Sequence, residues 1–235
     1  GAARRSSTVM VRPPPVVMFT TASVACLMRG RNSMNTAGSG VGRPCAAGFH
    51  VLNGNGEMTG VHWIREVGEL TMPVTISSTH AIGACHTGVV EWINEVHPRM
   101  AAQWLLPVCA ETWDGYLHDI NGGHVTPADV RAALDTAAPG PIAEGSVGGG
   151  TGMNCYGFKG GSGTASRTIE FGSTTYTVGV FVQANFGSRE ELEINGVPVG
   201  RTLEVPNPFE TTDWFENDLR APGGAGSVII IVATD

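Results

Sequence analysis

Two kinds of hydrophobic spacing occur along the chain, one typical of strands and one typical of helices. Partial alternation over 60–67 (GVHWIREV) predicts a strand, and 72–77 (MPVTIS) predicts another. Helical spacing over 81–96 predicts an amphipathic helix that ends before Pro98. The apolar face of this helix comprises Ile82, Val89, Ile93 and Val96.

A second helix is expected to begin near Thr126 and to run through Ala137. Thr126 is a favourable N-cap residue, Pro127 suits the first helical position, and Asp129 is favourable in the first turn. The residues expected to face the core are Val130, Ala133 and Leu134.

Strand patterns dominate the C-terminal half. Residues 168–171 and 175–185 predict a pair of strands joined by a turn at 172–173, and a further tight turn is expected at Gly196. The apolar run 228–232 predicts a fully buried strand. Strands and helices mixed in this order predict a layered α+β domain.

The first 47 residues differ from the rest. They contain PPP, RGRNS and GSGVGRP and no sustained hydrophobic period, so residues 1–47 are expected to be irregular. Residues 48–235 are expected to form the folded domain.

Composition and charge argue against several classes of protein. Glycine accounts for 33 of the 235 residues, which indicates many turns and close backbone contacts. A net charge of −7 without an extended basic cluster argues against nucleic acid as a partner. No apolar run reaches the ~18 residues of a membrane span, so no membrane partner is expected either.

The cysteines favour a reducing compartment. There are 5, an odd number, and no two form a CxxC pair, which fits neither a disulfide framework nor a zinc ribbon. Reduced thiols predict a cytoplasmic protein. Arg4-Arg5 before the stretch 16–28 leaves a periplasmic or secreted location as the alternative.

The glycine-rich run 145–167 lacks the marks of a nucleotide-binding loop. Lys159 is followed by Gly160 rather than by Ser or Thr, and strand-like residues follow where a dinucleotide fingerprint requires a helix. His118 and His124 are not accompanied by an HExxH motif or by further spaced ligands. Neither a metal nor an organic cofactor is therefore expected.

The leading candidate for chemistry is the dipeptide Gly226-Ser227, directly before the apolar run 228–232. A serine hydroxyl is a poor nucleophile without a base, and the chain has no G-x-S-x-G elbow. Cleavage between the two residues would give Ser227 an α-amine with a pKa near ~8, which can deprotonate its own hydroxyl. Glycine at 226 would leave room for the attack. A loop that simply enters a strand is the alternative reading.

Two polar residues near strand ends are candidates for the rest of such a site. Glu111 follows the apolar run 104–110, where a carboxylate could hold a substrate ammonium. Asn185 ends the run 177–184, where an amide could donate to an oxyanion. A solvated loop carboxylate and an ordinary turn residue are the alternatives.

Several motifs together resemble one protein family. They are FHVLNGNGEMTG (49–60), STHAIG (78–83), AETWDGYLHDINGGHV (110–125), SVGGGTGMNCYGFKGGSGTASR (146–167), VGVFVQANFG (178–187), INGVPVGR (194–201) and GSVIIIVATD (226–235). From about residue 47 onward the chain resembles the self-processing aminopeptidases that include the L-aminopeptidase/D-amidase/D-esterase and the β-peptidyl aminopeptidases.

The resemblance implies an αββα sandwich, similar in layout to the N-terminal nucleophile hydrolases but differently connected. It implies self-cleavage before Ser227, release of N-terminal residues from peptides, amides or esters without a cofactor, and a homo-oligomer, commonly a tetramer. It also implies that Asn185 stabilises the oxyanion and that Glu111 binds the free amine of the substrate. Trp113 stands where the family is expected to have a tyrosine, so a substrate contact at this position would have to do without that hydroxyl.

The resemblance also implies a longer β chain beyond Asp235, with a helper serine and glutamate. Residues 48–226 then correspond to the α chain and 227–235 to the start of the β chain. The predicted function is that of a self-processing serine aminopeptidase. The alternatives are a catalytically silent fragment that acts as a binding or assembly module, and a related acyltransferase or amide hydrolase.

Overall fold

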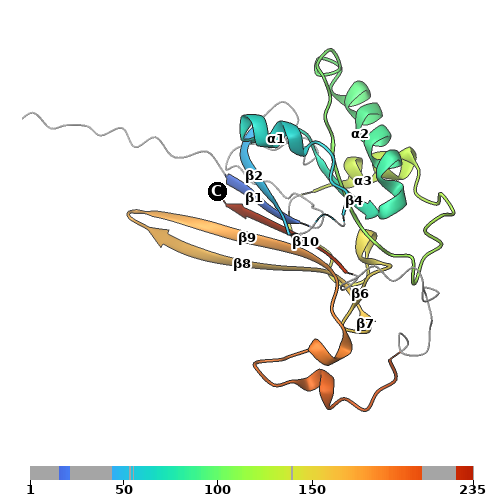
Figure 1. Cartoon of the computed structure of the whole chain (residues 1–235). Helices are drawn as coiled ribbons and strands as arrows, with labels where there is room; N and C mark the ends of the chain where they lie inside the picture. Colours follow the sequence, from blue (N-terminus) through green and yellow to red (C-terminus); the bar gives the residue numbers. More distant parts are fainter. Residues whose placement is uncertain are drawn as a thin grey trace, which may run out of the picture.

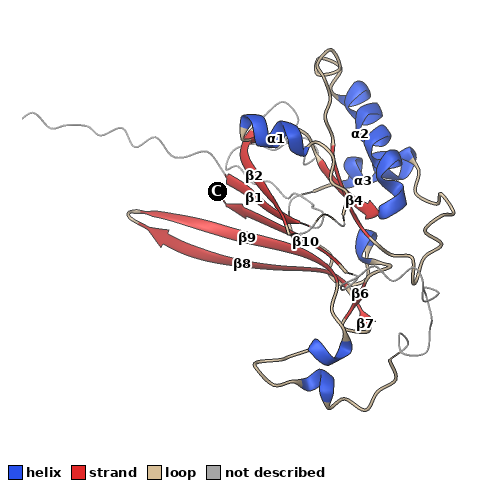
Figure 2. Ribbon diagram, in the orientation of Figure 1, coloured by secondary structure: helices blue, strands red, loops and turns tan. Residues whose placement is uncertain are grey.

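The structure is a computed structural model that describes residues 16–21 (backbone alone), 44–52, 54, 56–138, 140–207 and 226–234. These residues form a large sheet, a small sheet and a pair of helices, stacked in that order (Figure 1 and Figure 2). The stack contains a helix layer and two sheet layers, as expected for one side of an αββα sandwich.

The large sheet has six strands in the order β3-β2-β1-β10-β9-β8. They are β1 (Val16–Thr21), β2 (Cys45–Val51), β3 (Glu69–Leu70), β8 (Gly161–Phe171), β9 (Thr174–Asn185) and β10 (Ser227–Thr234). Strand β1 is parallel to β2, and the other neighbouring pairs are antiparallel. The last described strand, β10, thus lies in the middle of the sheet, between β1 and β9.

The small sheet and the helices complete the layers. Strand β4 (Val74–Ser78) is parallel to β5 (Val108–Thr112), and helices α2 (Ile82–Val96) and α3 (Pro127–Thr136) pack on the outer face of this pair. The remaining elements are α1 (Val61–Val67), the strands β6 (Asn154–Cys155) and β7 (Phe158–Lys159), and the short 3-10 helices η1 (Thr79–Ala81), η2 (Gly148–Gly150), η3 (Arg189–Glu191) and η4 (Val199–Arg201).

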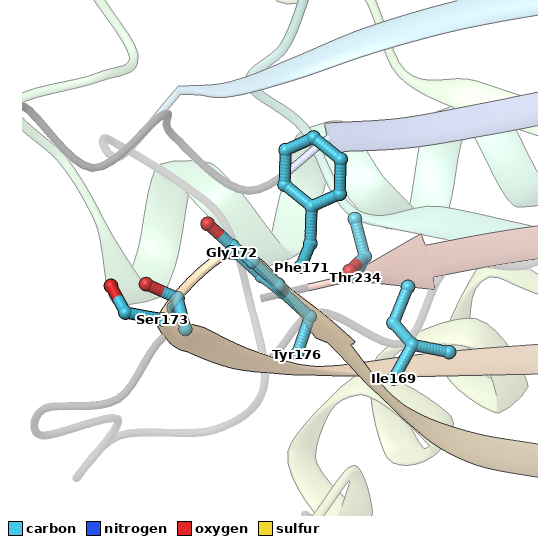
Figure 3. Close-up of a pocket in the computed structure, with 7 residues that line it drawn as sticks. Ile169, Phe171, Gly172, Ser173, Tyr176 and Thr234 are labelled. Carbon is cyan, nitrogen blue, oxygen red and sulfur yellow. The ribbon is translucent and has the colours of Figure 1, made fainter.

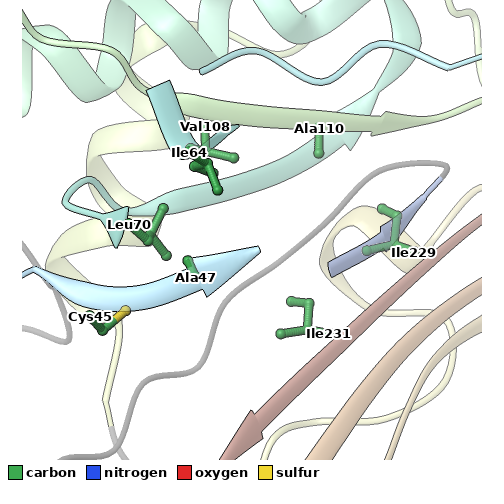
Figure 4. Packing of buried hydrophobic residues seen from close by; sticks show 8 residues of the cluster. All are labelled: Cys45, Ala47, Ile64, Leu70, Val108, Ala110, Ile229 and Ile231. Atoms are coloured by element: carbon green, nitrogen blue, oxygen red, sulfur yellow. The ribbon is translucent and has the colours of Figure 1, made fainter. Parts of the chain in front are cut away.

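One hydrophobic cluster fills the space between the two sheets (Figure 4). Its buried members are Cys45, Ala47, Ile64, Leu70, Val108, Ala110, Ile229 and Ile231. On β10, Ile229 and Ile231 point into this cluster, whereas the alternate residues are half-buried. The prediction of a fully buried strand over 228–232 is therefore wrong for one of its faces, because α1, α2 and α3 all lie on the side of the sheet that Ile229 and Ile231 face (Figure 1).

A second cluster joins β5 to the helices. Its buried members are Met72, Cys85, Val89, Trp92, Ile93, Cys109, Val130 and Leu134. Strand β5 contributes Val108 and Ala110 to the first cluster and Cys109 to the second. Because β5 is buried on both faces, its next residue, Glu111, is also buried and only 3% exposed.

The two predicted helices are confirmed, with differences at their edges. Helix α2 begins at Ile82, and Val96, expected on its apolar face, is 46% exposed because it lies in the last turn beyond the packed segment. Helix α3 begins after Thr126, whose backbone N–H donates to the carboxylate of Asp129 (2.8 Å). Ala133 is exposed rather than inward-facing, because α3 meets the core through Val130 and Leu134.

The segment 60–67 was predicted to be a strand and forms α1 instead. Gly60 (φ 74°) and Gly68 (φ 70°) bound it in left-handed conformations that favour glycine. Between them Ile64 anchors a short helix to the core through a single buried side chain. The alternation was too short to distinguish a strand from two helical turns.

The other strand predictions agree with the structure in position. The pair with a turn at 172–173 is confirmed as β8 and β9, and β4 lies at the second predicted strand. Gly196 occupies a tight turn (φ 78°) closed by an isolated bridge between Ile194 and Val197. Within the N-terminal stretch predicted to be irregular, the described residues include β1 and the start of β2, and residues 1–15 and 22–43 lie outside the described part.

The second cluster predicts a pH effect on stability. Burial, together with a smaller contribution from the neighbouring Cys109 thiol, raises the pKa of the Cys85 thiol from 9.0 to about 11. A group with a raised folded-state pKa stabilises the fold below its unfolded pKa, and this contribution is lost as the pH rises through the folded value. Urea denaturation should therefore show a free energy of unfolding that falls by roughly 1–3 kcal/mol between pH 9 and 11 because of Cys85. Cys85→Ala should show a smaller decrease, and equal decreases in the two proteins would contradict this reasoning.

Candidate active site

Ser227 lies at the first position of β10, directly opposite Asn185 at the end of β9. The Asn185 Nδ2 group donates a hydrogen bond to Ser227 Oγ (2.9 Å), and the backbone N–H of Trp113 donates to the same oxygen (3.1 Å). Ser227 and Asn185 are both buried. Two donors from different elements therefore converge on one hydroxyl oxygen.

Both ends of the Asn185 amide have partners. Its Nδ2 also donates to the carbonyl of Trp113 (2.7 Å), and its Oδ1 accepts from the backbone N–H of Asn154 (2.8 Å). A carbonyl acceptor on one side and an N–H donor on the other fix the orientation of the amide. The sequence placed Ser227 and Asn185 in one site, and the geometry brings them together.

A buried arginine fixes the hairpin that presents Asn154. In the turn between β6 and β7, Tyr156 has a left-handed backbone (φ 53°) that costs energy in a residue other than glycine. Arg189 Nε donates to the carbonyl of Tyr156 (2.9 Å), and its Nη2 donates to the carbonyl of Gly157 (2.7 Å). The guanidinium also lies over the ring of Phe158, 3.7 Å from its centroid. Arg189 thus stabilises the turn that supports the amide of Asn185.

Gly226 approaches the end of β9 closely. A Cβ on Gly226 would lie 3.0 Å from Cβ and 3.1 Å from Cα of Phe186, which is tighter than ordinary van der Waals contact. A side chain at this position would require Phe186 or Gly226 to shift by a few tenths of an ångström. The glycine therefore lets the chain before Ser227 pass close to the end of β9.

Glu111 lies within β5 rather than in a loop after a strand. Its Oε1 accepts from the backbone N–H of Glu57 (2.9 Å), and its Oε2 accepts from the hydroxyl of Thr79. The neighbouring Thr112 bonds to Gln183 of β9 (2.5 Å), so Glu111 points from the opposite face of β5. Among the described contacts none joins Glu111 to Ser227 or Asn185, and none gives it a cationic partner.

Trp113 contributes to the site through its backbone, while its side chain is 39% exposed. The sequence predicted a substrate contact at Trp113. It did not predict that the backbone N–H and C=O of Trp113 would contact Ser227 and Asn185. Backbone groups are the same in every residue, so no sequence signal marks them.

The glycine-rich loop packs closely against Gln183 of β9 and against Asp114. A Cβ on Gly149 would lie 2.9 Å from Gln183 Oε1, and a Cβ on Gly152 would lie 2.6 Å from Cβ of Asp114. The next part of the run, from Gly161, is strand β8. Because a strand stands where a phosphate-binding loop requires a helix, these glycines serve close packing rather than nucleotide binding.

Other kinds of site are not found in the described part of the chain. No group of three or more His, Cys, Asp or Glu side chains there is placed to hold a metal ion. None of the helices in that part combines the length and hydrophobicity that crossing a bilayer requires.

An apolar hollow of about 450 Å³ lies at the tip of the β8–β9 hairpin (Figure 3). It is lined by Ile169, Phe171, Gly172, Ser173, Thr174, Tyr176 and Thr234. Thr234 is seven residues along β10 from Ser227, or about 23 Å at the rise of a strand. The hollow is therefore separate from the cluster around Ser227.

The sequence and the fold are both similar to those of known proteins. The chain is 46% identical over 219 residues to the β-peptidyl aminopeptidase BapA of Sphingosinicella microcystinivorans. Its fold is similar to that of the L-aminopeptidase D-Ala-esterase/amidase of Ochrobactrum anthropi, with a TM-score of 0.70 and 44% identity, and to that of a Burkholderia β-aminopeptidase, with a TM-score of 0.69 and 45% identity. The Ochrobactrum protein is described as a prototype of the serine aminopeptidases and a variant of the Ntn hydrolase fold. The expected fold class is confirmed by these similarities.

The coverage of these matches is unequal. The match to BapA covers 92% of this chain but 52% of BapA, and the matches to the Ochrobactrum and Burkholderia structures cover 83% of this chain and 58% and 57% of theirs. The chain thus spans about half the length of the curated relative that it matches. The profile of peptidase family S58 matches residues 29–235, further toward the N-terminus than the motifs indicated. With most of its length matched by that profile, the chain belongs to peptidase family S58.

Proposed function

We propose that the polypeptide containing this chain is a self-processing serine aminopeptidase with Ser227 as nucleophile. The observation that carries the proposal is the pair of hydrogen bonds that Asn185 and the Trp113 N–H donate to Ser227 Oγ, directly after Gly226. A carbonyl carbon attacked by Ser227 Oγ carries its oxygen next to that hydroxyl, so both donors lie close to where the oxyanion develops, as an oxyanion-stabilising site requires.

The first reaction is cleavage of the bond between Gly226 and Ser227. Ser227 Oγ attacks the carbonyl carbon of Gly226 and gives up its proton, the C–N bond breaks, and the nitrogen takes up a proton and leaves as the amine of Ser227. Water then hydrolyses the ester between Gly226 and Ser227 Oγ. The products are a carboxylate on Gly226 and a free α-amine and hydroxyl on Ser227.

The second reaction uses the new terminus on a substrate. The α-amine takes the proton from Ser227 Oγ, and this oxygen attacks the carbonyl carbon of the substrate's first residue. The oxyanion accepts hydrogen bonds from Asn185 Nδ2 and the Trp113 N–H. The leaving amine takes up the proton, and water releases the first residue from the acyl-enzyme.

Glu111 is proposed to bind the free amine of the substrate. Each of its carboxylate oxygens accepts one described hydrogen bond and retains a second lone pair for an ammonium group. A buried carboxylate without a described cationic partner is costly to the fold, and a substrate ammonium would offset that cost. This requirement for a free amine separates an aminopeptidase from an endopeptidase.

The proposal extends to assembly and location. The exposed side chains of Ile169 (47%) and Phe171 (78%) at the hairpin tip offer an apolar surface for a homo-oligomer of the longer polypeptide. Cys85, Cys109 and Cys155 are free thiols, which supports a cytoplasmic location. Short peptides, amino-acid amides and esters are the proposed substrates.

The test uses paired substrates that differ only in their amine. Purified full-length polypeptide is given p-nitroanilides of L-alanine, D-alanine and β-alanine, each with a free and with an N-acetylated amine. The free amines are expected to react at least about 100-fold faster in kcat/KM, because a buried charge pair is lost on acetylation. Glu111→Gln is expected to reduce this preference, and equal rates on free and acetylated substrates would reject an aminopeptidase.

A further inference from the structure

The peptide groups of Trp113 are held in place by the residue that follows it. The Trp113 N–H contacts Ser227 Oγ and its C=O contacts Asn185, yet Trp113 and Asp114 lie just beyond the end of β5, outside the ladder of the small sheet. A backbone that leaves a strand needs other contacts to keep a fixed position. The side chain of Asp114 supplies them.

Asp114 is a buried carboxylate, 8% exposed, with both oxygens in use. The hydroxyl of Ser78, at the end of β4, donates to Asp114 Oδ1 (2.8 Å), and Nδ1 of His118 lies 2.8 Å from Oδ2. The backbone carbonyl of Asp114 accepts the N–H groups of Leu117 and His118 (3.1 Å each). The carboxylate therefore ties the turn after β5 to the neighbouring strand.

The glycine-rich loop closes the remaining side. Gly152 passes so near that a Cβ there would lie 2.6 Å from Cβ of Asp114. Because a backbone segment stands where a side chain would otherwise be, Asp114 has little room to change rotamer. The Asp114 side chain is thus enclosed on three sides: by Ser78 of β4, by His118 of its own turn and by Gly152 of the glycine-rich loop.

The order of these bonds differs from that of a Ser-His-Asp triad. In such a triad the imidazole lies between the hydroxyl and the carboxylate. Here Ser78 donates directly to the carboxylate and His118 lies on its other side, so the imidazole is not placed to take a proton from Ser78. The cluster is built to hold a backbone segment.

We propose that Asp114 is a positioning residue, fixed by Ser78 and His118, that holds the N–H of Trp113 against Ser227 Oγ. The inference rests on the proposed function, in which the Trp113 N–H donates a hydrogen bond to the oxyanion. Displacement of an oxyanion donor by about 1 Å can cost on the order of 100-fold in rate. Loss of this support should therefore slow both self-cleavage and turnover.

The experiment compares Ser78→Ala, Asp114→Asn and Asp114→Ala in the full-length polypeptide. Self-cleavage is followed by intact mass as a first-order process, and turnover of alanine p-nitroanilide is expressed per titrated active site. We expect Asp114→Ala to lower both rate constants about 10- to 100-fold, mainly in kcat, because the donor acts on the reacting oxygen. Asp114→Asn keeps the acceptor for Ser78 and should lose less.

Two comparisons separate positioning from folding. Asp119→Ala removes a carboxylate of the same segment that is 69% exposed and pairs with His124, and it should leave both rate constants unchanged. Ser78→Ala and Asp114→Asn should be coupled, so that the double variant is little slower than the slower single variant.

The proposal is overturned if Ser78→Ala and Asp114→Asn both react at the wild-type rate. It is also overturned if the variants lower the melting temperature while kcat per active site and the self-cleavage rate constant stay constant. Ser227→Ala, measured alongside, shows which idea has failed. If that variant still cuts and turns over substrate, the proposed function is wrong; if it is inert while the Asp114 variants are normal, this inference alone is wrong.

Discussion

Ser227→Ala in the full-length polypeptide is expected to remain a single uncut chain and to lose turnover by at least about four orders of magnitude. The substitution removes the hydroxyl that receives the hydrogen bonds of Asn185 and Trp113, and it removes the atom that would form the acyl bond. Self-cleavage and turnover should disappear together, because one oxygen is proposed to perform both reactions.

Intact mass and N-terminal sequencing measure the first effect, and release of p-nitroaniline measures the second. Ser173→Ala is the matched control, since Ser173 also follows a glycine but lies at the exposed turn of the β8–β9 hairpin. The control should cut and turn over like the wild type. A wild-type protein that is active while its 226–227 bond is intact would refute the mechanism.

The comparison between Ser227 and Ser173 shows what the sequence could and could not reveal. Within the described residues, glycine precedes serine at 145–146, 161–162, 172–173, 187–188 and 226–227. The long apolar run after 226–227 distinguished it as the entrance to a strand. What gives Ser227 its partners is the approach of Asn185, 42 residues earlier, and of Trp113, 114 residues earlier. A local pattern does not contain such distances, and the family resemblance supplied Asn185.

Elements with local causes were predicted well. The cap and first turn of α3, the spacing of α2 and the hairpin of β8 and β9 each depend on residues close in sequence. The error at α1 arose where a seven-residue segment with one buried side chain gave too little periodicity. The position of β10 between β1 and β9 had no local cause, because it places the last described strand beside the first.

The same distinction between local and long-range causes applies to the candidate active site. Polar residues at the ends of apolar runs, such as Glu111 and Asn185, were visible in the sequence because buried strands seldom carry them. The direction in which Glu111 points was not visible, since it depends on which face of β5 meets the large sheet. The contacts of Asp114 with Ser78 and Gly152 depend likewise on β4 and the glycine-rich loop reaching the same turn.

Asn185→Ala is expected to lower kcat for peptide amides by about 100- to 1,000-fold, the usual cost of removing one oxyanion donor. KM should change little, because the donor strengthens its bond as charge develops on the oxygen. Self-cleavage should slow by a similar factor if the same amide serves both reactions. Removal of the side chain also leaves the N–H of Asn154 and the carbonyl of Trp113 without their described partner, so melting temperature is measured in parallel.

Asn185→Asp separates electrostatics from packing. The carboxylate has nearly the same shape and still accepts from the Asn154 N–H, but it places an oxygen where Nδ2 now donates to Ser227 Oγ and to the Trp113 carbonyl. Negative charge facing a developing oxyanion should make this variant slower than Asn185→Ala, despite the better fit. Asn195→Gly, at an exposed turn with a left-handed backbone (φ 51°), is the neutral control. If Asn185→Asp keeps most of the wild-type kcat, the amide of Asn185 shapes the end of β9 and does not stabilise the transition state.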